Sequence, residues 1–207
     1  MRLLITIFIF FALGVQAFAN EKFHMDGDTL FYDTNLAKEE VNAEINWEDA
    51  DYIYKILLEN PNLTRMQLNS GGGLVEAAKY ISDLVIDFEL DTYVIGECSS
   101  ACVDIFLAGN KRVLQKGSWL GFHKGSWAAT DMKNFYDFKR KEEGWNNPFE
   151  FSSWLYEDTQ EEILRQMKYM LERGVKADFI IETLQADNEG MWYPRRKRLS
   201  EAGVITE

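Results

Sequence analysis

The order of apolar and polar residues predicts several short β-strands. Residues 23–32 alternate in polarity around Gly27 and Asp28, which predicts a β-hairpin. Further along the chain, short apolar stretches end at turn-forming residues, and each stretch is typical of a strand. These stretches are residues 63–68, 92–95, 112–114 and 119–122.

Amphipathic stretches with helical spacing lie between the predicted strands. Asn46 is a good N-cap for a helix that ends before Pro61, because apolar residues then recur every three or four positions. Residues 74–88 predict a second helix, and the very apolar residues 101–108, followed by Gly109, predict a third. Strands that alternate with helices predict an α/β domain with parallel pairing, in which ligands bind at the carboxyl ends of the strands.

The last third of the chain is less regular. Residues 124–160 hold many aromatic side chains among charged ones without a clear period. We interpret this segment as an insertion that packs on the domain or on another subunit. Helical spacing returns in residues 157–173 and 176–185, and residues 199–205 are expected to close the chain as a helical turn and a strand.

The chain begins like a secretory signal peptide. Arg2 supplies a positive charge, residues 3–15 are almost wholly apolar, and residues 17–19 have the small-residue pattern that precedes signal-peptidase cleavage. The apolar run is shorter than a membrane-spanning helix needs. We therefore expect residues 1–19 to be removed on export to the periplasm, with an uncleaved anchor as the alternative, and residues 20–207 to form one domain.

The charge of the chain argues against some classes of partner. Its 207 residues carry a formal net charge of −12, and 46% of them are hydrophobic, as in a globular protein. An acidic surface repels phosphate groups, so neither nucleic acid nor anionic lipid is expected as a partner.

Two cysteines occur, Cys98 and Cys102. In an oxidising compartment, their spacing across the start of a helix allows a disulfide, and two buried thiols are the alternative. Two cysteines and one nearby histidine are too few for a closed zinc site. No metal or other cofactor is therefore expected.

Ser100 and His123 are the residues best suited to nucleophilic catalysis. Ser100 lies where a predicted strand turns into the helix of residues 101–108, and the amides at a helix start suit an oxyanion. The alternative role for Ser100 is an ordinary N-cap. His24 falls in the first residues after the signal peptide, so His123 is the better general base, and a structural histidine is its alternative.

Three consecutive glycines, residues 71–73, follow another predicted strand. Glycines let backbone N–H groups approach a reacting carbonyl where a side chain would block them. A phosphate-binding turn is the alternative, but neither the Walker lysine pattern nor G-x-G-x-x-G is present.

Four separated motifs resemble the proteolytic subunit of Clp protease (ClpP) and its periplasmic relatives. They are Leu68-Asn69-Ser70-Gly71-Gly72-Gly73, Gly96-Glu97-Cys98-Ser99-Ser100-Ala101-Cys102, Leu107-Ala108-Gly109 and Gly121-Phe122-His123. Their order and spacing resemble the family over residues 63–125, and residues 199–205 resemble its end. The resemblance implies a single α/β domain built as a crotonase-like, ClpP-type spiral of β-β-α units.

The resemblance also implies roles for individual residues. Ser100 matches the nucleophile and His123 the general base. The backbone N–H groups of Gly72 and Ala101 match the oxyanion hole, whereas Gly71 stands where the family has proline.

The acid of the family's catalytic triad has no clear counterpart. The best alignment places Gly190 at its position. Asp187 is our candidate for the third catalytic residue, and Glu189 is the alternative. Loss of the orienting acid lowers kcat by about 10⁴ in a true triad, so a dyad or an inactive relative is also open.

The function expected from the resemblance is a serine peptidase that cleaves peptides or unfolded protein through an acyl-enzyme. A homo-oligomer is expected as well, with residues 124–160 as a candidate contact. No ATPase partner is expected, because the periplasm lacks ATP. The alternatives are a non-catalytic binding or scaffold protein and, less favoured, acyl-thioester chemistry of the crotonase type.

Overall fold

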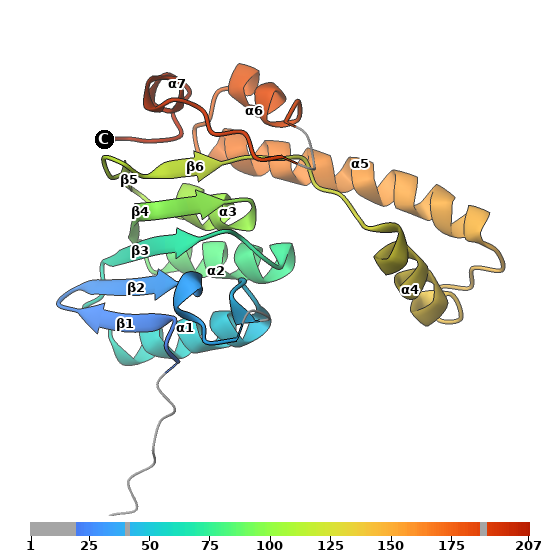
Figure 1. Cartoon of the computed structure of the whole chain (residues 1–207), viewed down its shortest axis with the longest axis horizontal. Helices are drawn as coiled ribbons and strands as arrows, with labels where there is room; N and C mark the ends of the chain where they lie inside the picture. The colour runs from blue at the N-terminus through green and yellow to red at the C-terminus, as the bar shows by residue number, and fades with distance from the viewer. Residues whose placement is uncertain (1–19, 40–41, 187–189) are drawn as a thin grey trace, which may run out of the picture.

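The computed structural model describes residues 20–39, 42–186 and 190–207, and the predicted signal peptide lies outside them. In the described part of the chain, six strands form one sheet in the order β1-β2-β3-β4-β5, with β6 paired to β4 (Figure 1). The strands are β1 (Phe23–Asp26), β2 (Thr29–Asp33), β3 (Arg65–Ser70), β4 (Asp91–Ser99), β5 (Arg112–Leu114) and β6 (Trp119–Gly121).

The strand pairing confirms both the hairpin and the parallel sheet expected from the sequence. β1 and β2 are antiparallel, whereas β2–β3, β3–β4, β4–β5 and β4–β6 are parallel. β4 is longer than predicted: Thr92–Val94 pair with β5, and Glu97–Ser99 pair with β6. Gly96 lies between the two halves with φ 92°, a value that favours glycine.

The helices interleave with the strands, and α1, α2 and α3 cover one face of the sheet (Figure 1). Asn46 and Asp49 form a capping box at the start of α1, as the sequence pattern suggested for Asn46. The helical elements are η1 (Thr34–Leu36), α1 (Trp47–Glu59), α2 (Val75–Asp87), α3 (Ala101–Ala108), α4 (Ala129–Lys139), α5 (Pro148–Glu172), α6 (Ala177–Thr183) and α7 (Arg196–Glu201).

Helix α3 lies in the middle of the hydrophobic core. All of its residues are buried, which explains why its sequence, apart from Asp104, is apolar on every side rather than on one face. The hydroxyl group of Thr92 on β4 donates a hydrogen bond of 2.7 Å to the carbonyl oxygen of Phe106 on α3. The helix is therefore fixed against the strand that precedes it.

The segment of residues 124–160 is more regular than its sequence suggested. It contains α4, and α5 begins at Pro148 rather than near residue 157, with Asn147 as its N-cap. Figure 1 shows α4 and the first part of α5 extending away from the sheet. We call residues 127–156 the aromatic arm. Its aromatic side chains pack largely on one another, and the ring centroids of Trp145 and Phe151 lie 5.0 Å apart. The helices therefore have no single apolar face that a sequence pattern would reveal.

The chain ends in α7 as a helical turn, but the strand predicted after it is absent from residues 202–207. Thr206 lies beside Arg112 of β5, and its N–H donates to the Arg112 carbonyl oxygen. The Arg112 N–H, however, donates to the Thr206 hydroxyl rather than to a backbone carbonyl. This side-chain bond replaces the backbone bond that a strand ladder would need. No helix among the described residues has the length and apolarity to cross a membrane.

Candidate active site

Ser100 occupies a sharp turn between β4 and α3. Its backbone has φ 53° and ψ −130°, a conformation that is unfavourable for any residue except glycine. The Ser100 N–H donates to the Gly121 carbonyl oxygen over 3.0 Å, which ties the turn to β6. The side chain makes no capping hydrogen bond to α3. The geometry therefore does not support the N-cap alternative, and the hydroxyl group is available for another partner.

That partner is His123. The Oγ atom of Ser100 lies 2.8 Å from Nε2 of His123, within the range of a hydrogen bond. His123 follows β6, and β6 pairs with β4 in a parallel arrangement in which Leu120 lies opposite Cys98. This pairing places Ser100 and His123 at the same carboxyl end of the sheet. A serine bonded to an imidazole nitrogen is the arrangement that nucleophilic serine catalysis requires.

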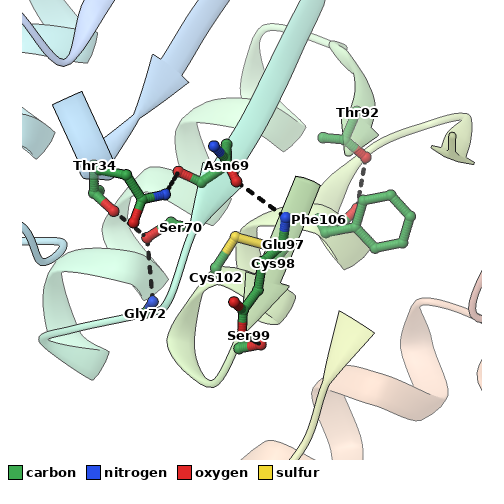
Figure 2. The surroundings of a disulfide bond; sticks show 11 residues. Thr34, Asn69, Ser70, Gly72, Thr92, Glu97, Cys98, Ser99, Cys102 and Phe106 are labelled. Atoms are coloured by element: carbon green, nitrogen blue, oxygen red, sulfur yellow. Dashed lines mark hydrogen bonds between the residues drawn. A yellow bond between two sulfur atoms is a disulfide. The ribbon is translucent and has the colours of Figure 1, made fainter. Parts of the chain in front are cut away.

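A disulfide joins the two sides of the Ser100 turn. Cys98 at the end of β4 is bonded to Cys102 in α3, and both residues are buried (Figure 2). The structure thus selects the disulfide from the two alternatives that the sequence left open. The bridge links the strand directly to the helix across the unfavourable backbone conformation of Ser100.

The glycine loop lies directly against the Ser100 turn. A Cβ atom at Gly72 would lie 2.8 Å from the carbonyl oxygen of Ser99, and φ at Gly72 is +112°. A Cβ atom at Gly73 would lie 2.3 Å from the backbone nitrogen of Ile45. The Ile45 N–H donates to the Gly72 carbonyl oxygen over 2.9 Å, so the segment before α1 holds this loop in place. Both positions therefore require glycine.

The two candidate oxyanion donors differ in their surroundings. Ala101 is the first residue of α3, and the first amides of a helix have no intrahelical acceptor. The Gly72 N–H instead donates to the hydroxyl oxygen of Ser70 over 3.1 Å, and this oxygen also accepts a bond of 2.9 Å from the Thr34 hydroxyl (Figure 2). Gly72 could donate to an oxyanion only if its bond to Ser70 were released.

Among the described residues, no acid forms a hydrogen bond with His123 to complete a triad. Asp187 and Glu189 lie outside the described residues. Trp192 and Phe122 exchange two backbone hydrogen bonds of 2.8 and 2.9 Å, which brings the segment from residue 190 beside His123. Met191 from this segment lines the cleft together with His123. Among the described residues, Ser100 is the one hydrogen-bond partner of the His123 ring.

A cleft of about 410 Å³ opens at Ser100 and His123. Residues 71–73 form part of its wall, and the remaining lining residues are Asn35, Ala43, Glu44 and Met191. Within the part of the chain that the structure describes, no group of three or more metal-ligating side chains lies together. The site offers a hydroxyl group, an imidazole and backbone amides, which together suit acyl transfer.

Sequence reasoning missed Ser70 as the acceptor of the Gly72 amide and Glu44 as a wall of the cleft. Ser70 stood within a recognised motif, but its bond to Gly72 depends on the bend of the loop. Glu44 carries no local signal, because only the pairing of Ile45 with Gly73 brings it to the site.

Comparisons with known proteins identify the fold. No protein-family model matches the chain, and no curated protein sequence matches it. Among solved structures, a mutant of ClpP1 from Listeria monocytogenes is similar, with a TM-score of 0.52 and 20% sequence identity. The match covers 78% of this chain and 84% of that one. The chain therefore has a ClpP-like fold, a mixed α/β structure in a single domain.

Proposed function

We propose that this chain is a ClpP-like serine peptidase that cleaves peptides or unfolded protein through an acyl-enzyme. The observation that carries the proposal is the 2.8 Å separation of Ser100 Oγ and His123 Nε2 in an open cleft. A ClpP-like fold is consistent with this activity but does not itself establish it.

The chemistry follows from the positions of these two side chains. Nε2 of His123 accepts the proton of the Ser100 hydroxyl while Oγ attacks the scissile carbonyl carbon. The carbonyl oxygen becomes an oxyanion, which the Ala101 N–H and, after its release from Ser70, the Gly72 N–H would stabilise. The imidazolium of His123 then protonates the leaving amine. Water then attacks the acyl-enzyme carbonyl while Nε2 of His123 accepts a proton from that water. The imidazolium returns a proton to Ser100 Oγ as the acyl group leaves.

The wider expectations from the sequence remain part of the proposal. We infer a crotonase-like spiral of β-β-α units, export to the periplasm and assembly into a homo-oligomer without an ATPase partner. The Cys98–Cys102 disulfide supports an oxidising compartment. The exposed apolar side chains of the aromatic arm, such as Phe138 and Phe149, support an intersubunit contact.

A second candidate is a binding protein that has kept the fold without catalysis. Two observations favour it: the Gly72 amide is already bonded to Ser70, and among the described residues Ser100 is the one hydrogen-bond partner of the His123 ring. Acyl-thioester chemistry has no comparable support.

Hydrolysis assays separate these two functions. The purified chain, its Ser100→Ala variant and its His123→Ala variant would be incubated with fluorescein-labelled casein and with p-nitrophenyl esters. The peptidase proposal predicts turnover by the natural chain and loss of turnover in both variants. Folded natural chain that hydrolyses neither substrate would overturn the peptidase and leave the binding protein.

A further inference from the structure

Among the described residues, one carboxylate lines the cleft. Glu44 is the acidic residue in its lining, and among the described residues no lysine or arginine lines it. Lys124, which follows His123 in sequence, is exposed outside the lining. A substrate in this cleft would therefore meet a negative charge close to the glycine loop.

Glu44 is held at this place by a buried ion pair. Lys22 donates from Nζ to the backbone carbonyl oxygen of Glu44 over 3.1 Å and to Oδ2 of Asp49 over 2.7 Å. Lys22 and Asp49 are only 4% and 1% exposed, so water competes little for these bonds. The backbone of Glu44 is thus fixed, whereas its side chain is exposed.

The next residue fixes the position of Glu44 relative to the site. Ile45 accepts a 2.8 Å hydrogen bond from the Leu74 N–H, and its own N–H bonds to the Gly72 carbonyl. Glu44 therefore precedes a segment that pairs with the candidate oxyanion loop. Among the ion pairs of the described residues, none uses the Glu44 carboxylate.

We propose that Glu44 selects substrates that carry a cationic side chain, lysine or arginine, near the scissile bond. The inference rests on the proposed function and specifies its substrate class. Because the backbone that carries this carboxylate is already fixed, binding a cation requires less ordering than it would on a mobile loop. The net charge of −12 adds a weaker attraction that raises the local concentration of cationic peptides.

Two matched esters measure this preference in catalysis. The Nα-benzyloxycarbonyl p-nitrophenyl esters of lysine and norleucine have side chains of similar length but differ in charge. The natural chain is expected to favour the lysine ester in kcat/KM by about fivefold, the effect of one partly exposed ion pair. The ratio should approach one in Glu44→Gln and in high salt. Glu59→Gln removes an exposed carboxylate that does not line the cleft and should keep the ratio.

Binding to the Ser100→Ala variant tests the same preference without catalysis. Dansylated Ala-Lys-Ala should bind more tightly than dansylated Ala-norleucine-Ala, and an added Glu44→Gln change should remove the difference. Equal binding of both peptides, or a lysine preference that survives Glu44→Gln, would overturn the inference. Selective binding by a chain that hydrolyses neither ester would instead overturn the proposed catalysis and keep the cation site.

Discussion

Gly72 lies so close to Ser100 that a Cβ atom on Gly72 would come within 2.8 Å of the Ser100 Cβ atom. The glycine loop and the Ser100 turn thus pack together with no room for a further side chain. This contact links two motifs that are separated in sequence and gives the candidate site its shape. It also leads directly to the first prediction.

Gly72→Ala should disrupt the site. The new methyl group would collide with the Ser100 turn, and alanine is strained at a φ of +112°. We expect hydrolysis to fall by more than about 100-fold, the scale of losing an oxyanion donor. The free energy of unfolding should fall by about 1–3 kcal/mol.

Gly71→Ala is the matched control for this prediction. A Cβ atom at Gly71 would meet nothing within 4 Å, so the melting temperature of the Gly71→Ala variant should stay close to that of the natural chain. Equal thermal stability of Gly72→Ala and Gly71→Ala would show that the packing of Gly72 against Ser100 has been misjudged.

Ser70→Ala should release the amide of Gly72. The Ser70 hydroxyl accepts the Gly72 N–H, so its removal leaves that donor free for an oxyanion. We expect kcat to rise by about fivefold, which corresponds to about 1 kcal/mol for one neutral hydrogen bond. Stability should fall, because the buried Thr34 hydroxyl also loses its partner.

Thr34→Val separates these two effects, since it removes the Thr34–Ser70 bond and keeps the bond between Ser70 and Gly72. It should lower stability without raising kcat. A lower kcat in Ser70→Ala at unchanged KM would contradict the view that Ser70 competes for the oxyanion donor.

The sequence was sufficient to predict the central elements of the fold. Residues 101–108 were recognisable as a buried helix because every position except Asp104 is small or apolar, and α3 has those bounds. The pairing of Ser100 with His123 was accessible because motif order and spacing resemble a known family. The α3 signal comes from the local composition of the helix, and the Ser100–His123 pairing follows from the spacing of motifs within the resemblance.

Other features depend on contacts between distant residues and left no local pattern. The helices of the aromatic arm pack aromatic rings against one another away from the main core, so their apolar positions do not form one stripe. The bond of Gly72 to Ser70 follows from a loop bend, and the place of Met191 follows from the pairing of Phe122 with Trp192. None of these contacts can be read from residue order alone.

The disulfide should matter more for activity than for stability. Cys98 and Cys102 are four positions apart, and closing so short a loop removes little entropy from the unfolded chain. The bridge does, however, fix β4 to α3 on either side of Ser100. We expect the double variant Cys98→Ala/Cys102→Ala to lose about tenfold or more in kcat, a scale consistent with misplacement of the nucleophile.

Thermal unfolding of the same double variant provides the comparison. A decrease of only a few degrees is expected, given the short loop. A double variant that keeps full activity would refute the role of the bridge in positioning Ser100.

Asp104→Asn should stabilise the protein at alkaline pH. Burial raises the pKa of the Asp104 carboxyl to about 6, against the opposing effects of a hydrogen bond from Gln166 and the charge of Lys79. The folded state thus binds this proton more tightly than the unfolded state. The contribution of Asp104 to stability is therefore favourable at low pH and is lost as pH rises through about 6.

Asparagine avoids the buried charge and can still accept the bond from Gln166. The gain in unfolding free energy should reach up to about 3 kcal/mol at pH 8 and shrink towards pH 4. Chemical denaturation at the two pH values measures it, with the exposed Glu59→Gln as the control for loss of a charge. A gain that is the same at both pH values would contradict the assignment to Asp104 ionisation.

The central claim, an activated Ser100, is tested most directly by reaction with a fluorophosphonate followed by intact-mass measurement and peptide mapping. The account predicts one adduct per chain on Ser100, none in Ser100→Ala and strongly slowed labelling in His123→Ala, because His123 accepts the serine proton. Absence of an adduct on the folded natural chain, or an adduct that persists in Ser100→Ala, would contradict it.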